Sequence, residues 1–336
     1  MSPAAPATRT APRLRVLDAA PGPEWAAAHR AEVLAEVEAS GAVLLRGLGV
    51  ASAADLAAVT AALGIEPMAE REGFAPREHH GGTVYSASHW PADAPMCMHH
   101  EQSYAAEVPG VLLFGCLTAP ERGGRTMLAD SQRVLRDLPP DLVEPFRRDG
   151  WLLLRSYQDV GVPWTDAFGT DDRARVDAYC AAEGIRHEWF DDGRLRTVQR
   201  RSAVVAHPRT GVPGWFNQIA FLNELTMDPV IREYLLDQYG PTGLPFTTAH
   251  GDGTPVDAGT VETVNAVYEA ATFGESWRDG DVLVVDNIRM AHSREPYEGS
   301  REVAVVLGDP VRLDGHVLTD GHVLPDGHVL PGGGAG

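Results

Sequence analysis

The sequence has few cysteines for its length, which limits the role that disulfides can play. Its 336 residues include Cys97, Cys116 and Cys180 as the only cysteines, and none of them belongs to a Cys-x-x-Cys pair. An odd, sparse set argues against a disulfide framework, and the apolar neighbours of Cys97 and Cys116 are typical of core positions. We therefore expect reduced thiols and a protein that works in the cytoplasm.

Basic residues and long apolar runs are also scarce. The basic residues are 28 arginines, with no lysine, and they are outnumbered by 47 acidic residues, which gives a formal net charge of −19. Such a surface repels nucleic acid and anionic membranes, so neither is expected as a partner. No run approaches the roughly 18 apolar residues of a membrane helix. The N-terminal MSPAAPATRTAPRLR lacks the apolar segment of a signal peptide, and we expect residues 1–15 to be mobile.

The sequence contains no G-x-G-x-x-G motif and no regular alternation of strands and helices, which argues against a nucleotide-binding α/β fold. It has instead many short β-branched apolar runs with turn signals between them, and helical periodicity in a few insertions. Strands are predicted at 41–49, 111–117, 126–130, 281–287 and 302–308, and helices at 23–40, 52–64 and 254–272. This pattern predicts a mainly β protein with inserted helices, as an antiparallel barrel or jelly roll.

The domain organisation follows from the length and from the repeats at the C-terminus. We expect one domain over 16–310, with a helical layer at its N-terminal end. The sequence DGHVL then occurs three times with a period of six, at 314–318, 320–324 and 326–330. Units this short cannot bury a core, so 311–336 is predicted to be a flexible tail whose histidines have no catalytic role.

The segment MHHEQSY, residues 98–104, carries adjacent metal-ligand side chains. If the segment is a strand, its side chains alternate between two faces, so His99 and Glu101 point one way and His100 points the other. The spacing therefore selects His99 and Glu101 as the pair that can share one metal ion.

A catalytic metal site needs a third ligand. The other histidines considered for this role are His79, His80, His89, His187, His207, His250 and His292. His292 has the best context, because it follows the buried-strand candidate DVLVVDN. Two histidines and one carboxylate form the facial triad of non-haem Fe(II) oxygenases, which leaves two positions for a chelating cosubstrate and one for O₂. Zinc with the same ligands would usually be tetrahedral.

Five motifs in a fixed order identify a family resemblance. They are GAVLLRGL, MHHEQSY, GCLTAPERGGRTMLADS, HPRTGVPGWFNQ and WRDGDVLVVDNIRMAHSREPYEGSREVAV. With them, most of 41–309 resembles the TauD/TfdA family of Fe(II)/2-oxoglutarate-dependent dioxygenases, closest to its SyrP-like, amino-acid-hydroxylating branch. The resemblance implies a double-stranded β-helix (jelly-roll, cupin-like) core, and Fe(II), 2-oxoglutarate and O₂ as cofactor and cosubstrates.

The resemblance also assigns residues. The family's metal ligands fall on His99, Glu101 and His292. The threonine and the arginine that hold the distal carboxylate of 2-oxoglutarate fall on Thr126 and Arg301. Physical chemistry supports the second assignment, because a guanidinium can grip a carboxylate with two parallel hydrogen bonds and a hydroxyl can add a third. Arg294, expected in a loop, is the weaker candidate for this role.

Two departures from the family pattern bear on the substrate. Val305 stands where taurine-type enzymes carry a second arginine for an anionic substrate, so a sulfonate substrate loses support. The carboxylate that related halogenases lack is present as Glu101, which favours hydroxylation or desaturation. In WFNQ, Trp215 and Phe216 are expected in the core and Asn217 is a candidate substrate residue. HPRTG, 207–211, is expected to be a polar turn.

The expected function is therefore that of an Fe(II)/2-oxoglutarate-dependent hydroxylase in a biosynthetic pathway for natural products. The resemblance implies a small-molecule substrate, an amino acid or a derivative of one, either free or held on a carrier protein. A zinc-dependent hydrolase would leave Thr126 and Arg301 unexplained, and a non-catalytic cupin-like binding protein would leave the triad without a task. The sequence does not decide between a monomer and a homo-oligomer.

Overall fold

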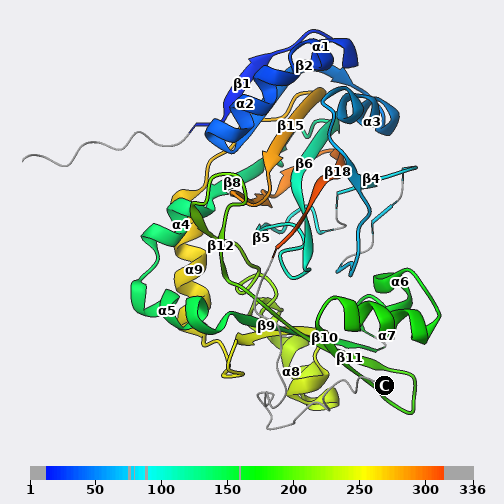
Figure 1. Ribbon diagram of the computed structural model, residues 1–336, viewed down its shortest axis with the longest axis vertical. Coiled ribbons are helices and arrows are strands. Elements are labelled where there is room, and N and C mark those ends of the chain that lie inside the picture. Colours follow the sequence, from blue (N-terminus) through cyan, green and yellow to red (C-terminus); the bar gives the residue numbers. More distant parts are fainter. Residues whose placement is uncertain (1–12, 75–76, 79, 88–89, 159, 314–336) are drawn as a thin grey trace, which may run out of the picture.

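Two β-sheets packed face to face form the centre of the molecule (Figure 1). The computed structural model describes residues 13–313 except 75–76, 79, 88–89 and 159. The large sheet has the order β1 (Arg15–Asp18), β2 (Ala42–Val50), β15 (Gly280–Asp286), β6 (Glu107–Thr118), β18 (Glu302–Arg312), β3 (Pro67–Met68), and β4 (Val84–Ser86) also pairs with β18. The small sheet has the order β5 (Met96–His99), β16 (Met290–Arg294), β8 (Thr126–Asp130).

The large sheet is buried on both faces because its central strands are apolar at consecutive positions. In β2, Val43 and Leu45 pack on one side, and Ala42 and Leu44 pack on the other. The first side is covered by α1 (Pro23–Ala28), α2 (Arg30–Ser40) and α3 (Ala53–Ala62), which lie together at the top of Figure 1. The second side packs against the small sheet, so the layers are helices, large sheet and small sheet.

A second group of elements lies below this sandwich in Figure 1. It contains the sheet β10 (Ile185–Trp189), β11 (Leu195–Arg201), β9 (Trp151–Tyr157), β14 (Phe246–His250), and the helices α6 (Trp164–Phe168), α7 (Arg173–Ala182) and α8 (Pro229–Tyr239). The remaining helices are α4 (Ser131–Asp137), α5 (Pro140–Asp149), α9 (Ala258–Ala271), η1 (Glu224–Thr226) and η2 (Pro241–Gly243). Two short pairs complete the strands: β12 (Val204–Ala206) with β13 (Pro213–Trp215), and β7 (Arg122–Gly123) with β17 (Tyr297–Glu298).

The predicted elements largely agree with the structure. The strands at 41–49, 281–287 and 302–308 correspond to β2, β15 and β18. Ser52 accepts a hydrogen bond from the Asp55 backbone N–H, as an N-cap does. The helix predicted over 23–40 is two helices, because His29 leaves the helical region and bonds its ring nitrogen to the Trp25 carbonyl oxygen. The mainly β, jelly-roll fold class is confirmed.

Strand β18 continues two residues beyond the boundary predicted at 310. It pairs with β6 as far as Arg312, and the Leu313 backbone N–H donates to the Ala106 carbonyl oxygen. The DGHVL repeats and residues 1–12 lie outside the described residues. In the described part of the chain, no helix combines the length and the apolar character that crossing a membrane requires.

Candidate metal and cosubstrate site

The small sheet brings two of the predicted ligands together by its strand register. β5 and β16 are antiparallel, and His99 lies directly opposite His292. β8 lies on the other side of β16, where Thr126 is opposite Arg294. A central strand flanked by two partners thus aligns metal-ligand and cosubstrate residues from three distant parts of the chain.

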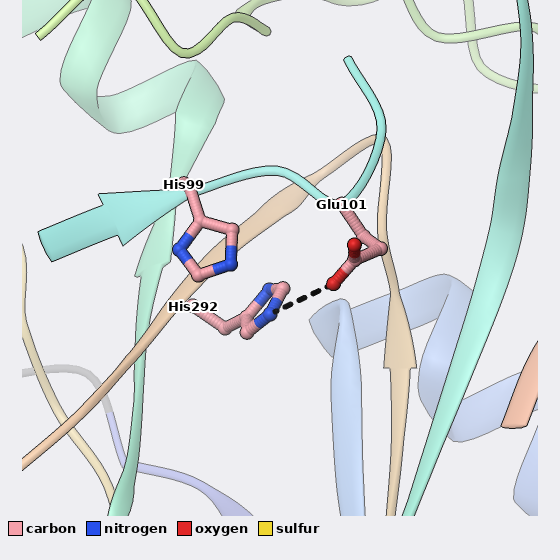
Figure 2. A group of neighbouring side chains, drawn as sticks. All are labelled: His99, Glu101 and His292. Carbon is pink, nitrogen blue, oxygen red and sulfur yellow. Dashed lines mark ion pairs between the residues drawn. The ribbon is translucent and has the colours of Figure 1, made fainter. Parts of the chain in front are cut away.

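Glu101 reaches the same point by a route that differs from the predicted one. β5 ends at His99, and 101–104 form a turn, so Glu101 does not share a strand face with His99. The turn brings the Glu101 carboxylate back towards both imidazoles (Figure 2). His100 points away from this group, and its two ring nitrogens lie 2.6 Å from the Asn287 carbonyl oxygen and 3.1 Å from the Trp215 carbonyl oxygen. The pairing of His99 with Glu101 was predicted for the wrong geometric reason.

The three side chains have the geometry and chemistry of a metal site. One ligand atom from each of His99, Glu101 and His292 lies within 4.8 Å of the others, and all three residues are buried. His292 Nε2 and Glu101 Oε2 are 3.8 Å apart, which is too long for a hydrogen bond. Ligands about 2.1 Å from one ion at right angles lie about 3 Å apart, so the three side chains draw closer together when an ion binds. Within the described ranges, no other three His, Cys, Asp or Glu side chains converge in this way.

The hydrogen bonds around the histidines set which nitrogen faces the ion. His99 Nδ1 is 2.9 Å from the Cys97 carbonyl oxygen, which can only accept, so Nδ1 carries the proton and Nε2 keeps its lone pair. His292 turns Nε2 towards Glu101, and its buried Nδ1 has no hydrogen-bond partner. Two nitrogens and one carboxylate oxygen are thus available to a first-row divalent metal.

The buried environment also sets the charges that a metal site needs. Burial lowers the pKa of His99 and lowers that of His292 well below its ordinary value. Burial opposes ionisation of Glu101, but the Arg77 charge and hydrogen bonds outweigh it and lower the pKa of that carboxyl. Two neutral imidazoles and one carboxylate are the protonation states in which these groups bind a metal.

Arg77 is one of the site residues that the sequence analysis missed. It lies between β3 and β4, and its Nη2 donates to both carboxylate oxygens of Glu101, at 3.1 Å and 3.0 Å. Its Nε is 3.4 Å from Glu70 Oε1. No periodicity or motif indicated this arginine, because its segment is irregular and only the tertiary fold places it beside Glu101.

Thr126 and Arg301 line one narrow cavity together with all three metal-ligand candidates. Thr126 is buried in β8, and Arg301 immediately precedes β18. Arg301 Nε donates to the Gly124 carbonyl oxygen at 2.9 Å, which fixes the plane of the guanidinium. Burial lowers the pKa of Arg301 to about 10, so the side chain still carries its charge at neutral pH. A partly buried cation and a hydroxyl beside a metal suit a dicarboxylate that also chelates the ion.

Arg294 and Val305 line the same cavity, and their surroundings distinguish them from Arg301. Arg294 was predicted to lie in a loop, but it is the last residue of β16. Its guanidinium donates to the backbone carbonyl oxygens of Trp90, Pro91 and Ala94. These bonds occupy Arg294 and leave Arg301 as the better partner for a carboxylate. Val305 adds an apolar wall.

A larger cavity of ≈ 720 Å³ shares His99 and Glu101 with the narrow one as lining residues. Its walls are mostly apolar and include Phe74, Trp90, Met96, Phe221, Leu222, Ile231 and Phe246. Asn217 does not line it: its amide donates to the Ala203 carbonyl oxygen and accepts from the Ile219 N–H. The neighbouring Gln218 does line it. This geometry speaks against the substrate contact predicted for Asn217, whose amide is used to hold the backbone.

The other histidines and the HPRTG turn have separate positions. His207 pairs with Asp286 at 2.8 Å, inside the predicted turn, where the Gly211 N–H donates to the His207 carbonyl oxygen. His187 pairs with Asp177, and His250 stacks on Phe146. His79 and His89 lie outside the described residues.

Asn287 holds the backbone of Glu101 in place. Its Oδ1 accepts from the Glu101 N–H at 2.8 Å, and its Nδ2 donates to the carbonyl oxygens of Glu101 and Pro109. Asn287 is fully buried, so these groups have no access to water as an alternative partner. The residue thereby positions the metal-binding turn.

Replacing Asn287 by Ala should therefore weaken both folding and iron binding. Each buried polar group left without a partner costs about 1–3 kcal/mol, and we expect unfolding free energy to fall by about 3 kcal/mol. Fe(II) affinity should fall roughly 10-fold, as outer-shell changes typically do. The matched control is Asn223→Ala, since the buried Asn223 bonds Thr248 and not the turn. It should lower stability in a denaturant titration without changing Fe(II) binding by calorimetry, and equal effects on iron would contradict the positioning role.

Comparison with known proteins agrees with this geometry. The sequence model of the family described as "Taurine catabolism dioxygenase TauD, TfdA family" matches residues 8–307. The chain therefore belongs to this family. It is an iron- and 2-oxoglutarate-dependent dioxygenase, which confirms the enzyme class, the iron and the cosubstrate expected from the sequence.

Individual relatives point in the same direction. The chain is 33% identical over 281 residues to the dapdiamide synthesis protein DdaC of Enterobacter agglomerans, covering 83% of this chain and 84% of that protein. It is 29% identical over 279 residues to a clavaminate synthase-like protein of Arabidopsis thaliana, covering 80% and 81%. The structure of PvcB, an Fe, alpha-ketoglutarate dependent oxygenase from an isonitrile synthetic pathway, aligns with a TM-score of 0.51 at 16% identity, covering 90% of this chain and 89% of that chain.

Proposed function

We propose that the enzyme hydroxylates an unactivated C–H bond of an amino acid, or of a molecule derived from one, in a biosynthetic pathway. In this proposal His99, Glu101 and His292 hold Fe(II), and Thr126 and Arg301 hold the distal carboxylate of 2-oxoglutarate. The observation that carries it is the ≈ 720 Å³ cavity, which opens directly on His99 and Glu101. Its size and mostly apolar walls suit a small organic substrate placed against the metal.

The relatives support a biosynthetic role for a small molecule. DdaC is described as a protein of dapdiamide synthesis, and the Arabidopsis relative as clavaminate synthase-like. Val305 supports the exclusion of a sulfonate, because an apolar side chain stands where an anion-binding arginine would be needed. The proposal includes substrates that are free and substrates held on a carrier protein.

The residues have distinct tasks in this reaction. Bound Fe(II), 2-oxoglutarate and O₂ supply the oxidising chemistry that breaks the C–H bond. Arg301 and Thr126 orient the cosubstrate, so that its other end faces His99 and His292. The aromatic walls, among them Phe221 stacked on His99 at 4.8 Å between ring centroids, exclude water and hold the substrate body. Asn287 keeps Glu101 in place while substrates exchange.

The proposal is tested by aerobic incubation with Fe(II), 2-oxoglutarate, ascorbate and a panel of amino acids, each supplied as the free acid and as its pantetheine thioester. We expect at least one panel member to gain one oxygen atom in step with succinate formation. The control reaction omits the amino acid and should form succinate far more slowly. Hydrolysis of a panel member with zinc, or binding of one without turnover, would contradict the hydroxylase and favour its two rivals.

A further inference from the structure

The large cavity is mostly apolar, but four carboxylate or guanidinium side chains line it, those of Glu70, Arg77, Glu101 and Asp228. Arg77 is the one arginine or lysine among the described residues that line it, and Glu70 lies beside Arg77. The side chains of Arg77 and Glu70 are only 8% and 15% exposed. In an otherwise apolar wall, these charged side chains are the groups that can fix the orientation of a polar ligand.

We propose that Arg77 and Glu70 recognise the head group of a free, zwitterionic α-amino acid, with the carboxylate on Arg77 and the ammonium on Glu70. The inference rests on the proposed function and narrows it, because an amino acid held as a thioester has no free α-carboxylate. The apolar walls then receive a neutral, apolar side chain such as that of leucine or phenylalanine.

The distances between the charged groups support this assignment. Arg77 Nε is 3.4 Å from Glu70 Oε1, which is longer than a tight charge-assisted hydrogen bond of 2.7–2.9 Å. Glu70 therefore keeps acceptor capacity for an ammonium group. The Arg77 guanidinium has five N–H donors. Nη2 serves Glu101, and Nη1 can donate to a substrate carboxylate in the same plane.

The balance of charge favours a molecule with no net charge. The buried cluster of Arg77, Glu70 and Glu101 has one negative charge in excess. A divalent cation, the two carboxylates of 2-oxoglutarate and the Arg301 guanidinium together add one positive charge and cancel that excess. The remaining charges that line the two cavities, Arg294 and Asp228, cancel each other. A zwitterion preserves that balance, whereas an anion or a cation would leave an uncompensated charge in a low-dielectric cavity.

The contact between Arg77 and Glu101 also predicts where the substrate is oxidised. Arg77 Nη2 is 3.0 Å from Glu101 Oε2, and a metal bound by Glu101 would lie about 2.1 Å from a carboxylate oxygen. The head group is therefore held within a few ångströms of the iron. The oxidised carbon should be close to the α-carbon rather than at the far end of the side chain.

The test is a binding experiment with matched ligands on the complete enzyme. The protein is loaded anaerobically with Fe(II) and 2-oxoglutarate and titrated calorimetrically with L-leucine and L-phenylalanine. Each is compared with its amide, which lacks the carboxylate, and with 4-methylpentanoate or 3-phenylpropanoate, which lack the ammonium. For at least one of the two amino acids we expect both analogues to bind roughly 30-fold more weakly, the effect of unpairing a desolvated charge.

Two variants assign the discrimination to residues. In Arg77→Gln, the affinities for the amino acid and for its amide should differ by no more than about threefold. In Glu70→Gln, the affinities for the amino acid and for the analogue without the ammonium should be equally close. The anaerobic Fe(II)–2-oxoglutarate charge-transfer band should persist in Glu70→Gln. Because Arg77 also holds Glu101, Arg77→Gln is titrated at Fe(II) and 2-oxoglutarate concentrations that restore the band. Arg196→Gln is the matched control, because Arg196 lies in β11, outside the described lining of either cavity, and bonds Thr242.

Three results would overturn the inference while leaving the proposed function intact. They are a wild-type enzyme that binds the amides as tightly as the amino acids, one that binds neither amino acid, and an Arg77→Gln variant in which all ligands weaken equally. The last result would mean that Arg77 only holds Glu101. Absence of the charge-transfer band in the wild type would instead remove the proposed function, and this inference with it.

Discussion

Arg301→Ala should weaken 2-oxoglutarate binding by roughly 30-fold or more while the protein remains folded. Arg301 is partly buried beside the metal-ligand candidates, and its guanidinium plane is fixed by the bond to the Gly124 carbonyl oxygen. Removing one partner of a desolvated, charge-assisted pair costs about 2–5 kcal/mol, and each 1.4 kcal/mol is about tenfold in affinity. Iron should still bind, because the triad is untouched.

Companion variants separate the charge from its geometry. Arg301→Lys should recover only part of the loss, since a point charge cannot reproduce the planar fork. Thr126→Val should cost roughly 1 kcal/mol, about fivefold, because only one neutral donor is lost. Arg125→Ala is the control, as Arg125 is more exposed and pairs with Glu295. The measurement is an anaerobic titration of the Fe(II)–2-oxoglutarate charge-transfer band, and an unchanged midpoint in Arg301→Ala would refute the assignment.

Loss of His99 or of His292 should reduce Fe(II) affinity more than any other single change. His99→Ala and His292→Ala should each reduce Fe(II) affinity by more than roughly 100-fold, which exceeds the usual effect of outer-shell changes. Turnover should disappear with the metal, while thermal unfolding should change little, because both imidazoles lie at cavity walls rather than inside the apolar core. Glu101→Ala should likewise abolish turnover.

These variants are read out by anaerobic calorimetry with Fe(II) and by succinate formation. His187→Ala is the control, because His187 pairs with Asp177 in the β10 region and does not belong to the cluster. Full activity in either alanine variant of His99 or His292 would show that the triad is misassigned. Wild-type rates in Glu101→Ala would remove Glu101 from the ligand set.

The strand predictions succeeded where a single strand carries its own signal. β15 and β18 are β-branched and apolar at consecutive positions, and the structure buries both of their faces. Asn217 shows the limit of this reasoning. An amide beside two aromatic residues is compatible with a cavity or with the backbone, and only the tertiary structure shows that it bonds Ala203 and Ile219.

Glu101 and Arg77 show two further limits. The alternation argument chose His99 and Glu101 correctly, yet the strand ends at His99 and a turn supplies the carboxylate. That turn depends on Asn287, which is distant in sequence. Arg77 had no local signal, because an arginine in an irregular segment has the same composition whether it faces solvent or a buried carboxylate.

The sequence by itself determined the fold class, the family, the cosubstrate and the residues expected to bind metal and 2-oxoglutarate. The fold class follows from local periodicity. The family, the cosubstrate and the 2-oxoglutarate residues follow from the resemblance that the ordered motifs carry. The tertiary structure alone decided that His99 faces His292, that Asn287 holds Glu101, and that Arg77 and Glu70 meet in the substrate cavity. Such contacts join segments far apart in the chain, and their formation depends on how strands register and sheets pack rather than on any local pattern.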